Sequence, residues 1–97
     1  MFLYCIIIMS NLPSVTLLKD RANIAYYDYV GKVVMRRARV GLENYVVIVD
    51  RKTGEDLCQI DVDNTSLFLK HKGKVVKFRG KLDKYHGLVT PHVKWEC

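Results

Sequence analysis

Apolar and polar residues alternate most clearly at residues 76–82, where valine, phenylalanine, glycine and leucine alternate with the cations Lys77, Arg79 and Lys81. A period of two residues is typical of a strand that buries one face and exposes the other. The sequence therefore predicts a strand with a row of positive charges on its exposed face. The alternative interpretation is a merely solvated face, because Lys and Arg also keep sheet edges soluble.

Four further strands are predicted from runs of β-branched and aromatic residues that turn residues separate. These strands cover residues 24–40, 45–50, 55–62 and 88–95. The first is long and is expected to bend at Gly31, and Asp50 and Gly54 indicate a tight turn after the second. Residues 63–66 offer side chains that cap helices and Gly73 is a natural stop, so one or two helical turns are predicted before the basic strand.

The amino-terminal residues 1–23 are interpreted as a lead-in to a domain at residues 24–97. Residues 11–23 have no clean period, and a short helix or strand is expected near residues 15–18. The apolar run at residues 2–9 lacks a preceding basic region and is too short to span a bilayer, so neither a signal peptide nor a membrane helix is predicted. Residues 1–8 are interpreted either as an extension upstream of a start at Met9, or as an extra strand or dimer contact.

The positive charge of the chain is concentrated in one segment. The 97 residues fit one domain, and 49% hydrophobic with 27% charged residues is the composition of a globular protein. Sixteen Lys and Arg against ten Asp and Glu give a net charge of +6, and seven of these cations lie in residues 70–84. A local excess of this kind attracts polyanions, and nucleic acid is favoured over a membrane surface or an acidic protein.

The sequence carries no recognisable catalytic or metal-binding motif. Its three cysteines have no disulfide or zinc spacing, which predicts a reducing, cytoplasmic location, and Cys58 is expected to be a small core residue. The histidines His71, His86 and His92 lack the spacing of metal ligands. Because phosphate-binding glycine loops and serine nucleophile elbows are also missing from the sequence, no enzyme activity, metal or cofactor is predicted.

Three segments carry a resemblance to a known group of proteins. Five strands with a short helix between the third and the fourth is the order of the OB-fold, a partly open Greek-key barrel. Residues 29–34, 49–54 and 73–82 resemble the patterns of OB-fold nucleic-acid binders, which include single-stranded-DNA-binding proteins and tRNA anticodon-binding domains. The likeness covers residues 24–95 and implies an all-β fold with one short helix, a five-stranded Greek-key OB-fold barrel.

The resemblance also implies a binding surface across the middle strands. This surface is flanked by the loop between the first and second strands and by the loop between the fourth and fifth strands. In such surfaces cations meet phosphates and aromatic rings stack on bases. Together with the fourth-strand cations Lys77, Arg79 and Lys81, the implied nucleic-acid-binding residues are Lys32, Arg36, Arg37, Arg39, Tyr45, Lys84, Tyr85 and His86. Tyr85, between a lysine and a histidine, is the best stacking candidate.

Two departures from the OB-fold pattern bear on the predicted function. The second and third strands lack aromatic rings at their centres, and the third is acidic, which shifts the expected surface toward the first strand, the fourth strand and the last loop. Tyr26, Tyr27 and Tyr29 are interpreted as core or rim residues rather than base contacts. The sequence thus predicts a small protein that binds single-stranded DNA or RNA with little sequence specificity. The alternatives are an OB-fold interaction or dimerisation subunit, which would dock a protein or a second copy through the apolar amino terminus, and an Sm-like or SH3-like topology.

Overall fold

The protein is mostly β, with one short α-helix. The computed structural model describes residues 12–37 and 44–91. In chain order the elements are β1 (Val15–Asp20), β2 (Ile24–Arg37), β3 (Asn44–Val49), β4 (Asp56–Ile60), the 3₁₀ turn η1 (Val62–Asn64), α2 (Thr65–Leu69), β5 (Val75–Asp83) and β6 (Leu88–Pro91). The predicted strands and the short helix before the basic strand are therefore confirmed over the described part of the chain.

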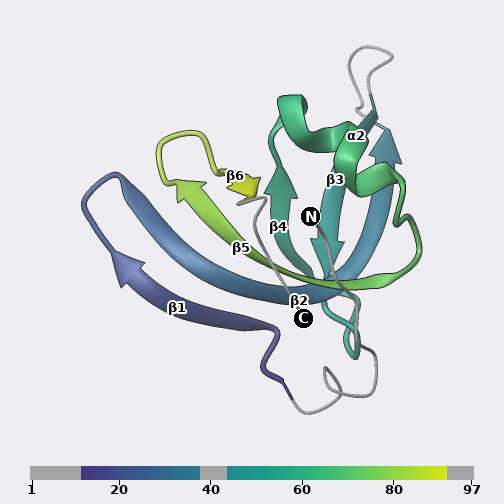
Figure 1. Ribbon diagram of the computed structural model, residues 1–97, viewed down its shortest axis with the longest axis horizontal. Coiled ribbons are helices and arrows are strands. Elements are labelled where there is room, and N and C mark those ends of the chain that lie inside the picture. The colour runs from purple at the N-terminus through teal and green to yellow at the C-terminus, as the bar shows by residue number, and fades with distance from the viewer. Residues whose placement is uncertain (1–11, 38–43, 92–97) are drawn as a thin grey trace.

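The strands form one mixed sheet in the order β1-β2-β3-β4-β6-β5, and β2 also pairs with β5. Hydrogen bonds therefore run in a ring through β2, β3, β4, β6 and β5, while β1 is attached to β2 outside that ring (Figure 1). All these neighbours are antiparallel except β4 and β6, which are parallel. The five predicted strands make up the ring, and β1 is a sixth.

Strand β2 is long enough to pair with three other strands. Its start pairs with β1, its end with β3, and residues 24–32 with β5, and the strand curves strongly along its length (Figure 1). Gly31 lies where these partners meet. A Cβ atom at Gly31 would lie 2.5 Å from the carbonyl oxygen of Val49 and 2.6 Å from Cγ2 of Ile48. Only glycine lets β2 and β3 approach this closely, which is the physical reason for a glycine inside the strand.

The core lies inside the ring and is closed by α2. Its fully or nearly fully buried members are Tyr29, Val33, Val46, Ile48, Ile60, Phe68, Val76, Phe78 and Val89. The Phe68 ring of α2 meets the Phe78 ring edge to face, with the ring centroids 4.9 Å apart, and Tyr29 stacks on Phe78 at 5.2 Å. The half-buried Cys58 packs against this cluster, as the sequence predicted.

The helix is held by packing rather than by the predicted caps. Neither Asp61 nor Asn64, the capping positions of η1 and α2, makes a side-chain cap hydrogen bond. The Asn64 amide instead donates to the Asp61 carboxylate at 2.7 Å. Gly73 has a φ of +82°, as expected for the residue that ends the helical segment.

Strand β5 has the predicted two faces. Val76, Phe78 and Gly80 are buried, while the cations between them point away from the core. At Gly80 a Cβ atom would lie 3.0 Å from Cε2 of Tyr29 and would overlap the side chain of Val89. The structure therefore has the alternation that the sequence predicts, and glycine at position 80 leaves room for the side chains of the neighbouring strands.

The segment expected near residues 15–18 is a strand, and the helix alternative is wrong. It forms β1, whose six residues are all exposed and which pairs with β2 with a bulge between Leu17 and Lys19. Predictions for the apolar run at residues 2–9, for Arg39 and for residues 92–95 fall outside the described residues. No helix in the described ranges is long and apolar enough to cross a membrane.

Candidate functional site

The side of the sheet that faces away from the core gathers most of the predicted fourth-strand cations. Core residues Tyr29 and Phe78 point inward from β2 and β5, so the residues adjacent to them in sequence point outward. Residues directly opposite each other on paired strands share a face. The strand registers therefore define which side chains meet on this surface, which we call the outward face of β1, β2, β5 and β6.

One row across the outward face places a tyrosine between two lysines on the neighbouring strands. Tyr26 of β2 lies opposite Lys19 of β1 on one side and opposite Lys81 of β5 on the other. Directly opposite residues have Cβ atoms about 5 Å apart. Neither lysine makes an ion pair with any described residue, so both charges are available to a ligand. We call these three residues the Lys19–Tyr26–Lys81 row.

The other outward cations differ in how far they are neutralised. Arg79 donates to Asp28 on β2, with Nε 3.1 Å from Oδ1, so part of its charge is already used. Lys77 lies opposite Val30, and Lys32 lies opposite Val75, and neither has an acidic partner among the described residues. Lys32 and Lys77 therefore extend the positive surface along β2 and β5.

Three further candidates lie where the end of β2 pairs with the start of β3. They are Arg36, Arg37 and Tyr45. Arg36 donates to Asp56 on β4, with Nη1 2.5 Å from Oδ2, and Tyr45 lies opposite Arg36 on β3. The Asp56 carboxylate raises the pKa of Arg36 and offsets its charge. Arg37 is exposed at the last position of β2. The structure does not bring this group together with the Lys19–Tyr26–Lys81 row.

The turn between β5 and β6 contains the last three candidates. Lys84 pairs with Asp20 and donates to the carbonyl oxygen of Arg21 at 2.7 Å, so it ties this turn to the turn between β1 and β2. His86 lies with Nδ1 2.6 Å from Oδ2 of Asp83, which lowers the pKa of that carboxyl. Tyr85 is 87% exposed, and its ring meets the His86 ring edge to face at 4.9 Å. Of these candidates, Tyr85 offers the most surface for stacking.

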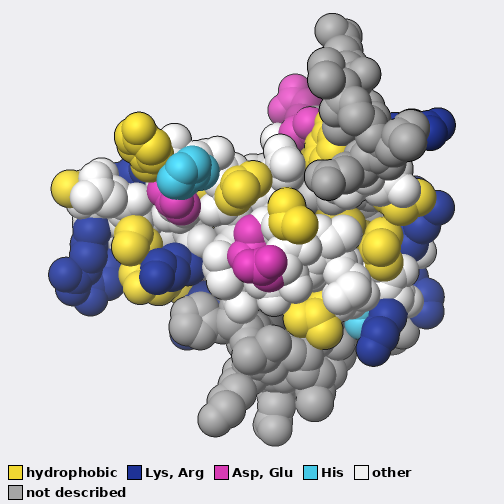
Figure 2. Space-filling view, turned by 90° about the horizontal axis from the view of Figure 1, so that it is seen from above, with side chains coloured by type: hydrophobic (Ala, Val, Ile, Leu, Met, Phe, Trp, Pro, Cys, Tyr) yellow, Lys and Arg dark blue, Asp and Glu magenta, His cyan; other side chains and the backbone are white. Residues whose placement is uncertain are grey.

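Positive charge is unevenly distributed over the molecule. Figure 2 shows Lys and Arg side chains toward both ends of the face seen from above, with acidic side chains near its middle. The exposed residues at and beyond the end of α2 include Lys70 and Lys72, which lie outside the Lys19–Tyr26–Lys81 row. The exposed acids Glu55 and Asp56 at the start of β4 would repel a phosphate chain, in keeping with the acidic third strand of the sequence.

The described residues contain no cluster of three or more His, Cys, Asp or Glu side chains that could hold a metal ion. Burial raises the pKa of the Cys58 thiol well above its ordinary value, so at neutral pH it is a protonated core group rather than a nucleophile. The lysines and the tyrosine of the row are groups that can bind an anion and contact an aromatic ring.

Two residues of the row were not among the binding residues predicted from the sequence. Lys19 fell in the lead-in, and only the pairing of β1 with β2 brings it to the outward face. Tyr26 was predicted to be a core or rim residue, and its half-buried side chain, which alternates with the inward Ala25 and Tyr27, fits a rim position. That alternation is the signal that could have identified Tyr26 as outward-facing.

The chain was compared with protein-family models, with curated proteins and with solved structures, and none of these comparisons found a match.

Proposed function

We propose that this chain is a small OB-fold protein that binds nucleic acid, with single strands favoured over duplexes. The strand order supports the fold. Counted along the chain, the strands of the ring pair in the order first, second, third, fifth, fourth and back to the first, and α2 lies between the third and the fourth. This order agrees with that of a Greek-key OB-fold barrel and supports the proposed fold, in which β1 would be an additional strand at the beginning.

The observation that carries the proposal is the Lys19–Tyr26–Lys81 row. Lysines bind phosphates and release their counterions, and a tyrosine ring stacks on a base. Lys32 and Lys77 continue the positive charge along the same two strands. The proposed surface is thus the outward face of β1, β2 and β5, away from the acidic residues of β4.

The preference for single strands follows from the tyrosine. Stacking needs a base whose flat face is free, and in a duplex both faces of each internal base are covered by its neighbours. A surface with charges alone would bind duplexes at least as tightly as single strands, because the phosphates of a duplex are more densely spaced.

The first experiment measures binding of labelled single-stranded DNA, single-stranded RNA and duplex DNA by fluorescence anisotropy. For the double variant Lys19→Glu with Lys81→Glu we expect at least about a tenfold loss of single-strand affinity, because two phosphate contacts become repulsive. For Tyr26→Leu we expect about a fivefold to tenfold loss for single strands and little change for duplexes, because one stacked base is lost.

The matched control is the double variant Lys70→Glu with Lys72→Glu. It makes the same change in net charge at two exposed lysines beside α2, and it should weaken binding far less. Equal losses in the two double variants would mean that net charge, rather than this surface, drives binding. No binding of the wild-type protein to any of the three nucleic acids at low salt would contradict the proposal.

A second function is supported by the exposed strand β1. Val15, Leu17 and Leu18 are 38%, 52% and 43% exposed, and β1 pairs with only one strand among the described residues. Apolar strand edges of this kind accept a further strand from another protein. The absence of nucleic-acid binding in the experiment above, together with a stable oligomer or complex that resists high salt, would favour this interaction subunit.

A further inference from the structure

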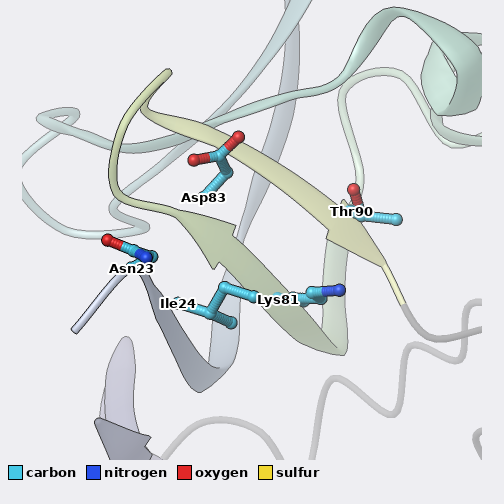
Figure 3. A pocket seen from close by; sticks show the side chains of 5 residues that line it. All are labelled: Asn23, Ile24, Lys81, Asp83 and Thr90. Carbon is cyan, nitrogen blue, oxygen red and sulfur yellow. The ribbon is translucent and has the colours of Figure 1, made fainter. Parts of the chain in front are cut away.

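A pocket of about 300 Å³ lies beside the Lys19–Tyr26–Lys81 row. It is lined by Asn23, Ile24, Lys81, Asp83 and Thr90 (Figure 3), which come from the start of β2, from β5 and from β6. Lys81 belongs both to the pocket and to the row, because it lies opposite Tyr26 on β2 and opposite Thr90 on β6. A strand of nucleic acid on the row would therefore pass the mouth of this pocket.

Two polar groups of the pocket are available to a ligand. The Asn23 side-chain amide makes no hydrogen bond with any described residue, while its backbone carbonyl accepts a hydrogen bond from the Lys84 amide at 3.0 Å, which fixes the position of the residue. The Lys81 ammonium has no acidic partner among the described residues. The pocket thus presents a side-chain amide, with one donor side and one acceptor side, next to a cation.

The other two polar groups are partly used by the protein. The Thr90 hydroxyl donates to Asp61 at 3.0 Å, which leaves its oxygen free to accept. The Asp83 carboxylate accepts the backbone amides of Tyr85 and His86 and contacts the His86 ring. Asp83 therefore holds the turn in shape, and its negative charge is part of the pocket lining.

The balance of charge decides between an anion and a neutral ring as occupant. One ammonium and one carboxylate line the pocket, so a phosphate placed inside it would meet Asp83 as well as Lys81. An uncharged heterocycle avoids this repulsion, can lie against the Ile24 side chain and can use the Asn23 amide. Side-chain amides pair with the donor and acceptor atoms on the edges of bases.

We propose that the pocket takes one unpaired nucleobase of the bound strand, with Lys81 contacting the adjoining phosphate. This inference rests on the proposed function and adds a base-reading site to it. Inserting a base requires that it first leave its stack and its pairing partner, which is easiest in a single strand. The pocket would therefore contribute to the preference for single strands, in addition to stacking on Tyr26.

The test uses eight-residue DNA strands of abasic sugar and phosphate, with or without one internal adenine. Both strands carry the same charge, so phosphate contacts are equal and the difference reports the base alone. The wild-type protein should bind the adenine-containing strand about tenfold more tightly, because the base gains both stacking and pocket contacts. In Asn23→Ala this preference should fall by a factor of about three or more, while affinity for the abasic strand stays unchanged.

The control is Gln59→Ala, which removes an exposed amide on β4 and should leave both affinities unchanged. Thermal unfolding of both variants would show whether each still folds. The comparison of the adenine-containing strand with the abasic strand uses the wild-type protein, so it does not depend on the folding of a variant. If Asn23→Ala left the preference intact, or if wild-type protein bound both strands equally, the base pocket would be wrong while nucleic-acid binding stood. If the wild-type protein bound neither these strands nor ordinary single strands, the result would contradict the proposed function itself, which is nucleic-acid binding.

Discussion

One carboxylate, that of Asp50, organises the turn between β3 and β4. Its Oδ1 accepts the backbone amides of Lys52 and Thr53 at 2.7 and 3.0 Å, and its Oδ2 accepts the Ser14 hydroxyl at 2.8 Å. The turn was predictable, because Asp followed by Gly four residues later is a local signal. The bond to Ser14 was not predictable, because 36 residues separate the partners and only the fold brings them together.

These bonds predict how stability depends on pH. The amides of Thr53 and Lys52, followed by the Ser14 hydroxyl, lower the pKa of Asp50 from its ordinary value to about 2. The folded state therefore prefers the charged carboxylate more than the unfolded state does. This contribution to stability is complete above the ordinary pKa of the group and is lost as the pH falls toward 2.

The measurement is urea unfolding of the wild-type protein and of Asp50→Asn at pH 5 and at pH 2.5. The Asn oxygen can still accept the two backbone amides, its NH2 group can donate to the Ser14 oxygen but cannot accept from it, and the side chain has no proton to bind in this range. We expect the wild type to be more stable than the variant at pH 5 and the gap to narrow at pH 2.5. A gap that is the same at both pH values would contradict the assignment. Asp63→Asn, at an exposed carboxylate without a hydrogen bond to any described residue, is the control.

At the scale of elements, local patterns predicted β5 well and β1 poorly. Strand β5 alternates without interruption, so its buried and exposed faces could be read directly from the sequence. In β1 a bulge between Leu17 and Lys19 breaks the period, and all six residues are exposed, so no apolar face marks the strand. Its identity as a strand comes from pairing with β2, which no local pattern encodes.

The helix α2 depends on one side chain. It has only five residues and no side-chain cap, which is too short to be stable by itself, and its Phe68 is completely buried against the Phe78 ring. Phe68→Ala should lower the free energy of unfolding by about 3–5 kcal/mol, because a large cavity would remain in the core. Leu69→Ala, at the neighbouring position that is 36% exposed, should cost much less. Comparable losses in the two variants, measured by chemical denaturation, would mean that α2 does not close the core.

At the scale of the whole molecule, the arrangement of the charges matters more than their sum. The net charge of +6 follows from composition, but pairing with Asp56, Asp28 and Asp20 already offsets Arg36, Arg79 and Lys84. On the outward face this leaves four cations without an acidic partner among the described residues. These cations are Lys19, Lys32, Lys77 and Lys81.

Four available cations predict the salt dependence of binding. For single strands the logarithm of the affinity falls with the logarithm of the salt concentration, with a slope of about −0.7 for each neutralised phosphate. If each cation meets one phosphate, the slope is about −2.8, and affinity falls about 50-fold between about 50 and 200 mM salt. Titrations across this range would measure the slope, and the variant Lys19→Glu with Lys81→Glu should lower its magnitude. A slope near zero would contradict a surface that binds phosphates.

Local patterns in the sequence specify the strands with regular alternation, the Asp50 turn and the two faces of β5, and composition alone specifies the excess of positive charge. These features depend on residues within a few positions of one another, so a local pattern is enough to encode them. The folded chain is needed to show which strands are neighbours, which cations pair with an acidic side chain, and that Tyr26 lies between Lys19 and Lys81. Those facts depend on the register between strands that are far apart in the chain, and register is set by the packing of the whole core.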